Sequence, residues 1–479
     1  MSLSSKNRVL LKRGHFGSEL YEFSAGSTYN DDKLPMLLNL TSNPYQAGFD
    51  TGSMLAKEYH EGFVNLIESL FGEEWWEPLA ARVLCKFLDS QYEKYLGVEL
   101  SDEYKEEFRG LSDGGREAGY SGYMRDIGLI ARRGQVLANI PSTLKDLKYV
   151  LMDEKKSLHL ALTLDKEEEA FVAAMLPKWE MIPPGSKSQP RGFGCSMLGV
   201  WGSRTEGGKL FTGRNLDYMT DTGVAKNKLF LVHHPPAGIA HVEVGWAGLW
   251  GVLAGMSAAG LTVHEANLES NDLTFRGYGW ILRMREVMSR AQSIDEAMEV
   301  WNSTGNTVGY NHGIGSGIKD GRMVVLETMA HHTAEFGDMD PREIAGGGTP
   351  RDEAVWRTNH GYDPYTIQHY MWNNTGAYQD SLLRYNLVPP MLDDYAAASQ
   401  AIGVQEIVNM TAILGGKGTK GDQPFTCTMP FTNEADNILS VAFSPSDLKV
   451  YAAYESGTGD GWIPAACNSY VEVDMTEYF

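Results

Sequence analysis

The feature that most constrains this chain is a break in its character at residues 181–194, where the sequence reads MIPPGSKSQPRGFG. Three prolines and three glycines in these 14 residues exclude a continuous helix or strand ladder, because proline lacks an N–H donor and glycine disfavours both elements. Upstream, residues 44–120 carry apolar side chains at spacings of three and four, which predicts amphipathic core helices. Residues 125–180 fit either helix or a strand followed by helix. We expect an α-rich leading segment, residues 1–194, and a second unit, residues 195–479.

The second unit begins with short β-type runs separated by Gly, Asn and Pro, as in stacked antiparallel sheets. Two helices are expected next, at 280–291 and 293–301, and Ser293 stands three residues before Glu296, which is capping-box spacing. More strands follow, and the last is a hairpin over 438–455. Strands, paired helices and further strands predict an α+β fold of the αββα type, with two antiparallel sheets between helical layers.

Composition and charge limit the partners and the location expected for this chain. The formal net charge is −21, so nucleic acid and anionic membrane surfaces are unlikely partners on electrostatic grounds. The sequence contains no apolar run of about 20 residues and no signal-peptide pattern at its start, so we expect no stable membrane insertion. As written, the chain is expected to be cytoplasmic, or lysosomal or secreted if a signal has been removed. Its four cysteines are too scattered for a disulfide scaffold or a zinc site.

Cys195 has an informative position, directly after Gly194 and at the start of a predicted strand. Cleavage between them would leave the thiol on an N-terminal residue, whose α-amino group has a pKa of about 7.7 to 8.0 and can accept the thiol proton near neutral pH. Arg214 and Asp217 follow in GRNLDY, on a strand expected to pair with the first. An arginine favours the thiolate, and an aspartate can orient the amine. Without this context, a buried packing cysteine would be the commoner interpretation.

Several ordered motifs agree with one family. C-S-x(16)-G-R-N-L-D-Y, GLWGVLAGMSAAGLTVHEANL, AVWRTNHGYDP and DSLLRYNLV occur in this order between residues 194 and 454. Together they resemble the N-terminal-nucleophile (Ntn) hydrolases of the acyl-coenzyme A:6-aminopenicillanic acid acyltransferase family, which are related to bile salt hydrolases, acid ceramidases and phospholipase B-like proteins. The long leading segment is closer to the phospholipase B-like relatives.

The resemblance implies a mechanism. It implies an autoprocessed enzyme, cleaved between Gly194 and Cys195 into two chains that stay associated. It also implies that the enzyme cleaves or transfers an acyl group from a linear amide, with a small N-acyl substrate and an acyl-coenzyme A donor as candidate partners and with no cofactor or metal. By resemblance, Cys195 is nucleophile and base, two asparagines surround the oxyanion, and three charged residues position the thiol and amine. These five supporting residues are Asn267, Asn359, Arg214, Asp217 and Arg384.

Other interpretations remain open at this point. The same fold could serve a phospholipase B-like ester hydrolase, or an unprocessed binding or scaffold protein. Trp246, Trp250 and Met256 either fill the sandwich core or line an acyl pocket. A Cys–His pair would require His264 or His360 near Cys195. The adjacent pairs His233-His234 and His331-His332 point to opposite faces if they lie in strands, so we expect no metal there.

Overall fold

The structure, a computed structural model, describes residues 3–4, 8–23, 34–71, 78–139, 194–218, 222–373, 375–417, 419–420, 423–424, 427 and 437–479. The Pro/Gly segment before Gly194 and the stretch 140–180 lie outside the described residues. The structure therefore does not test the predictions made for them.

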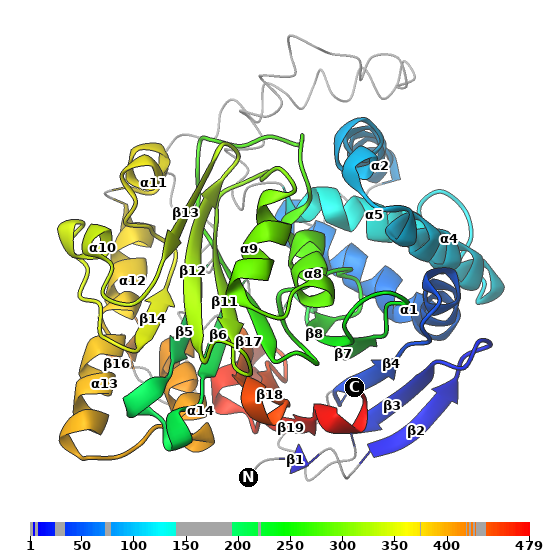
Figure 1. The fold of residues 1–479 in the computed structure, drawn as a ribbon. Coiled ribbons are helices and arrows are strands. Elements are labelled where there is room, and N and C mark those ends of the chain that lie inside the picture. The colour runs from blue at the N-terminus through cyan, green and yellow to red at the C-terminus, as the bar shows by residue number, and fades with distance from the viewer. Residues whose placement is uncertain are drawn as a thin grey trace.

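Two large sheets form the centre of the molecule (Figure 1). In spatial order the seven-stranded sheet contains β1 (Leu3–Ser4), β19 (Val471–Asp474), β18 (Lys449–Tyr454), β17 (Asn437–Ser444), β6 (Phe211–Asp217), β5 (Gly194–Val200) and β14 (Ala354–Arg357). The ten-stranded sheet contains β13 (His332–Phe336), β12 (Arg322–Met329), β11 (Tyr310–Ser316), β10 (Leu261–Asn267), β9 (Ala254–Ser257), β8 (His241–Trp246), β7 (Lys228–His233), β4 (Met36–Asn39), β3 (Glu19–Phe23) and β2 (Arg8–Arg13). A small separate pair joins β15 (Thr419–Lys420) to β16 (Gln423–Pro424). Within the two large sheets, neighbouring strands run antiparallel except β4–β7 and β1–β19, which are parallel.

Helices cover both outer faces. The helices are α1 (Pro44–Phe71), α2 (Pro78–Gln91), α3 (Gly97–Glu99), α4 (Asp102–Glu117), α5 (Ile127–Ala138), α8 (Trp280–Arg290), α9 (Ile294–Asn302), α10 (Pro341–Ala345), α11 (Pro364–His369), α12 (Gly376–Tyr385), α13 (Val388–Ala397) and α14 (Val404–Ala412). Helices α8 and α9 pack on the ten-stranded sheet, and α14 packs on β17 and β6 (Figure 1). The predicted α+β sandwich is thereby confirmed.

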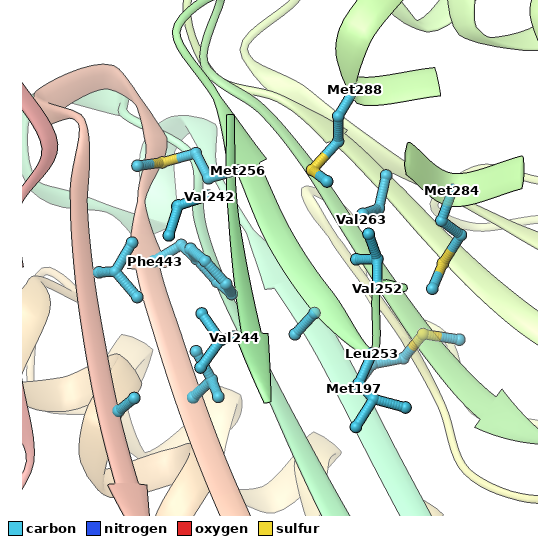
Figure 2. Close-up of a cluster of buried hydrophobic side chains, with 14 of the residues drawn as sticks. Met197, Val242, Val244, Val252, Leu253, Met256, Val263, Met284, Met288 and Phe443 are labelled. Carbon is cyan, nitrogen blue, oxygen red and sulfur yellow. The ribbon is translucent and has the colours of Figure 1, made fainter. Parts of the chain in front are cut away.

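The inter-sheet core follows from strand alternation, since successive side chains point to opposite faces. Figure 2 shows Val242, Val244, Met256 and Phe443 grouped among buried side chains of both sheets, while Met284 and Met288 belong to α8. All are fully or almost fully buried. Burying such side chains contributes about 1.5–3 kcal/mol each.

The leading segment is woven into both sheets. Strand β4 pairs with β7, and β1 pairs with β19. Helices α1 and α4 cross closely because glycines face the partner backbone: a Cβ on Gly48 would lie 2.1 Å from the Glu107 carbonyl oxygen, and one on Gly114 would lie 2.0 Å from that of Phe49. Within the described ranges, no helix is long and apolar enough to cross a membrane.

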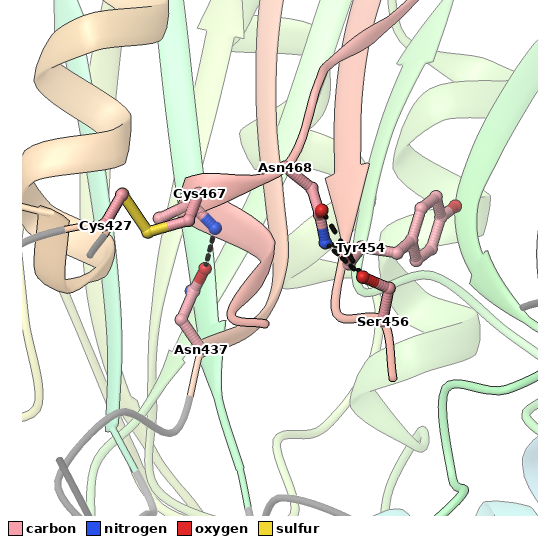
Figure 3. Close-up of a disulfide and its surroundings, with 7 residues drawn as sticks. Cys427, Asn437, Tyr454, Ser456, Cys467 and Asn468 are labelled. Carbon is pink, nitrogen blue, oxygen red and sulfur yellow. Dashed lines mark hydrogen bonds between the residues drawn. A yellow bond between two sulfur atoms is a disulfide. The ribbon is translucent and has the colours of Figure 1, made fainter. Parts of the chain in front are cut away.

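Local predictions downstream are also met. The Ser293 side chain accepts a hydrogen bond of 3.2 Å from the main-chain N–H of Glu296, as expected at a helix N-cap. The hairpin of β17 and β18 turns at Pro445–Asp447. A disulfide joins Cys427 to Cys467 (Figure 3). It is a single crosslink and not a scaffold, and the sequence spacing gave no indication of it.

Candidate active site

Cys195 lies near the start of β5, close to the end of β6 in the same sheet and to the end of β10 in the other sheet. In the β5–β6 register Gly194 is opposite Asp217, and Cys195 is opposite Leu216. Strand alternation places Cys195 and Met197 in the core cluster between the sheets. Cys195 is therefore buried, with 3% of the residue exposed.

Asn359 reaches Cys195 because β14 runs antiparallel to β5. Arg357 is opposite Met197, so the chain two residues further on lies level with Cys195. The side-chain oxygen of Asn359 accepts a hydrogen bond of 2.8 Å from the Cys195 main-chain N–H, and its amide nitrogen donates to the Asn267 carbonyl at 2.8 Å. One asparagine thus connects the start of β5 to the end of β10.

Arg384, from α12, fixes the same corner. Its guanidinium donates to the Cys195 carbonyl oxygen at 2.6 Å and to the Asn359 side-chain oxygen at 2.9 Å. Asp380, one helical turn earlier, accepts from its Nε at 2.8 Å. This double contact holds the Cys195 backbone and the Asn359 amide in one arrangement.

Arg214 is the cation beside the thiol. Its Nη2 lies 3.7 Å from Cys195 Sγ, and it forms a buried ion pair with Glu265. Sequence analysis missed Glu265. The available signal was its position two residues before Asn267 in HEAN, which places both side chains on the same face of β10.

Asp217 lies beside Gly194. Its Oδ1 accepts a hydrogen bond of 2.9 Å from Asn437, at the start of β17. A Cβ at position 194 would lie 3.1 Å from both Asp217 Oδ2 and Arg384 Nη2. Only glycine leaves these two charged groups undisturbed.

Burial raises the pKa of the Cys195 thiol to about 12, and the negative charge of Glu265 acts in the same direction. Arg214 opposes this rise, as does a main-chain hydrogen bond from Asn267. In the intact chain the thiol is therefore protonated at neutral pH, and it needs a base to react. Burial also raises the pKa of Glu265, which Arg214 partly offsets.

Neither candidate histidine supplies that base. His264 Nε2 bonds Thr212 at 3.0 Å, and His360 bonds Ser381 and Tyr362. Burial lowers the pKa of both imidazoles to about 3. Among the described residues, neither forms a hydrogen bond with the Cys195 thiol, so the Cys–His alternative is not supported.

An apolar cavity of about 130 Å³ opens on Cys195. The side chains around it are mostly apolar and come from both halves of the chain: Leu66, Leu137, Ala138, Leu216, Tyr218, Val224, Trp246, Leu249, Leu253, Trp280 and Tyr310. Gly194, Asp217, Glu265 and Asn267 complete its wall. The leading segment thus forms part of the cavity, through α1 and α5.

Of the three large apolar residues considered for this pocket, only Trp246 lines it. Met256 lies opposite Val242 in the register and is buried beside it in the core (Figure 2). Trp250 packs in the helical cluster, with its ring centroid 5.7 Å from that of Tyr59. Met256 and Trp250 therefore pack in the core. Met256 is at an internal position of β9, and Trp250 is covered by α1.

The fold and site define an αββα sandwich with a buried cysteine at the start of a central strand. The model of the acyl-coenzyme A:6-aminopenicillanic acid acyl-transferase family matches residues 203–458, just over half of the chain. The chain belongs to this family. The matched range contains Arg214, Asp217, Asn267, Asn359 and Arg384, and it begins eight residues after Cys195.

Individual relatives are distant. An uncharacterized protein of Archaeoglobus fulgidus is 23% identical over 379 residues, which is 75% of this chain and 55% of the relative. The chain thus spans about half the length of that relative.

Three solved structures are similar at low TM-scores. A mutant conjugated bile acid hydrolase from Clostridium perfringens gives a TM-score of 0.38 at 13% identity, over 59% of this chain and 93% of that one. The Caenorhabditis elegans ortholog of N-acylethanolamine-hydrolyzing acid amidase gives 0.35 at 15%, over 53% and 93%. Penicillin V acylase from Agrobacterium tumefaciens gives 0.33 at 12%, over 59% and 87%.

Proposed function

We propose that this chain is an N-terminal cysteine amidohydrolase or acyltransferase, in which Cys195 attacks the carbonyl of a linear amide. The observation that carries the proposal is that Cys195 is held at its N–H, its carbonyl and its thiol, at the wall of an apolar cavity. A packing cysteine needs none of these polar contacts. Positioning of this kind supplies a large part of a catalytic barrier reduction.

In the proposed reaction the free α-amine of Cys195 takes the thiol proton, and the sulfur bonds to the substrate carbonyl carbon. The Asn359 amide and the Asn267 main-chain N–H are the donors proposed for the resulting oxyanion. The leaving amine takes the proton as the C–N bond breaks, which leaves a thioester. Water or an acceptor amine then attacks the thioester, and the thiol regains a proton.

The α-amine must first be released. In the proposed maturation, Cys195 Sγ attacks the Gly194 carbonyl, the peptide becomes a thioester, and water divides the chain into residues 1–194 and 195–479. The fit of a bare glycine between Asp217 and Arg384 supports this step. The two products would stay associated, because β1–β4 hydrogen-bond within sheets formed by the later residues.

The proposed substrate carries an apolar acyl group, because the cavity beside the thiol is lined mainly by hydrocarbon and aromatic side chains. The family description adds an acyl-coenzyme A donor as a candidate. The alternatives from the sequence are an ester hydrolase of phospholipase B-like type and an unprocessed relative without activity.

Intact mass and N-terminal sequencing test the proposal together. Incubation at neutral or mildly acidic pH should convert the 53.0 kDa chain into two fragments, the second starting CSMLGVWG. Gly194→Val should stop this conversion. Matched amide and ester substrates then separate the amidase from the ester hydrolase. A chain that never divides and releases no acyl group would refute the proposal.

A further inference from the structure

A second polar cluster lies on the outer face of the ten-stranded sheet, beneath α4 and α8. His233 of β7 is directly opposite His241 of β8 in the strand register. Glu243 is two residues beyond His241, so alternation places its side chain on the same face. The structure thus brings together three metal-ligating side chains that are separated in the sequence.

These three residues present one ligand atom each within 4.8 Å of one another. The imidazole rings stack, with centroids 5.1 Å apart, and His233 Nε2 lies 3.5 Å from Glu243 Oε1. All three residues are buried. Two imidazoles and a carboxylate at such spacing form a donor set for a first-row divalent ion.

His241 offers a lone pair directed at this point. Its Nδ1 bonds the Ile239 carbonyl oxygen at 2.9 Å, so Nδ1 carries the proton and Nε2 is the acceptor. This Nε2 has no hydrogen-bond partner among the described residues. It is buried, since only 2% of His241 is exposed.

Charged side chains surround the three ligands. Arg285 bonds Glu243 through both carboxylate oxygens and also bonds Glu107. Glu107 approaches His233, with its Oε1 3.9 Å from Nδ1. A bound cation would satisfy the unpaired imidazole nitrogen of His241.

We propose that His233, His241 and Glu243 form a binding site for a divalent transition-metal ion of the zinc class. A cavity of about 350 Å³, lined by His233, His241, Glu107 and Arg285, gives the ion access and leaves room for a solvent ligand. Arg285 and Ile239 act as outer partners that orient the carboxylate and one imidazole. The cavity shares no lining residue with the one at Cys195, so the site is separate from the proposed acyl chemistry.

Sequence analysis expected no metal at the adjacent pair His233-His234. His234 Nε2 bonds the Asn39 side-chain oxygen at 2.7 Å, and His234 is not among the three clustered ligands. The cross-strand partner His241 was not considered, because the β7–β8 register is not visible in the sequence. His234 therefore provides a matched control on the same strand.

Titration of the full chain with Zn²⁺ after chelator treatment and dialysis, followed by calorimetry, tests the site. We expect one ion per chain with micromolar or tighter affinity, visible absorption on Co²⁺ loading, and no binding of Ca²⁺. His233→Gln and His241→Phe should each weaken Zn²⁺ by at least about 100-fold, because a lost ligand costs more than a lost outer partner. His234→Gln should leave the affinity within about threefold.

His241→Phe separates a lost ligand from a lost fold. The phenyl ring keeps its stacking partner, but it removes both the unpaired Nε2 and the Nδ1 donor to the Ile239 carbonyl, so the melting temperature of each protein is compared with and without Zn²⁺. The parent alone should then gain melting temperature with Zn²⁺. Absence of stoichiometric Zn²⁺ or Co²⁺ binding to the parent, or binding that persists in both His233→Gln and His241→Phe, would overturn the proposal.

Discussion

Asn437 donates a hydrogen bond of 2.9 Å from its side-chain amide to Asp217 Oδ1. Its side-chain oxygen accepts from the Ala466 main-chain N–H at 2.8 Å, directly beside the disulfide of Cys467 (Figure 3). One buried asparagine thus connects the crosslinked turn to the carboxylate beside Gly194. Substitutions at Asn437 and at the disulfide should therefore have different effects, one on activity and the other on stability.

Asn437→Ala should impair the site, whereas Cys467→Ser should affect mainly stability. The alanine leaves the buried Asp217 carboxylate without this donor, which costs about 1–3 kcal/mol and should slow processing and turnover. The serine opens a crosslink with a sequence separation of 40, worth about 2–4 kcal/mol, but it leaves the Ala466 N–H in place. Denaturant unfolding and initial rates on both variants measure this. Equal rate losses in both would contradict the distinction.

Cys195→Ala should abolish both chain cleavage and acyl release, because it removes the proposed nucleophile. Cys195→Ser keeps an attacking oxygen of higher pKa and should cleave much more slowly than the parent. The control is Cys85→Ala. Cys85 is also buried, and burial raises its pKa to about 11, but it packs among the helices of the leading segment. Mass spectrometry and acyl release should show near-parental values for it; a comparable loss would indicate a structural role for both cysteines.

Sequence motifs predicted most of the residues around Cys195, but they did not predict which of these residues form ion pairs. Cys195 and Arg214 were singled out from their places on two strands expected to pair, whereas Asn359 and Arg384 were named only from the family resemblance; the contacts of both with Cys195 come from the structure. Glu265 was missed because its contribution comes from an ion pair with Arg214 on the other sheet. Its position two residues before Asn267 indicates a shared strand face but does not identify this partner. Strands β2–β4 were likewise not anticipated, since they complete a sheet whose other strands begin at residue 228.

Met256 and Trp250 show a second limit. Composition and periodicity place both residues inside the protein, but only the register and the covering helices decide between core and pocket. Trp246 lies at the end of β8, where the packed core gives way to the cavity. The pairing of His233 with His241, and of Cys427 with Cys467, depends in the same way on contacts between distant segments.

Glu265→Gln should shift thiol reactivity to lower pH. The pKa of Cys195 is raised to about 12 by burial first and by Glu265 next, so removing that negative charge stabilises the thiolate and lowers the pKa. The rate of Cys195 alkylation in the uncleaved chain should rise about tenfold per pH unit below the pKa. The curve of rate against pH should lie at lower pH for the variant than for the parent. Peptide mapping follows Cys195 and Cys85 in the same sample, and the Cys85 curve should not move. An upward displacement for Cys195 would contradict this electrostatic assignment.

Leu137→Ala should raise KM for long acyl chains more than for short ones, because Leu137 of α5 belongs to the leading segment and lines the cavity beside Cys195. Each methylene buried against the wall contributes about 0.8 kcal/mol, so two methylenes correspond to roughly tenfold in KM. Acetyl, hexanoyl and phenylacetyl amides should therefore differ steeply with the parent and less steeply with the variant. Leu10→Ala, at an exposed position on β2 of the same segment, is the control and should reproduce the parental series. A flat response to acyl length in the parent would show that this cavity does not hold the acyl group, and an unchanged slope in Leu137→Ala would show that the leading segment does not shape it.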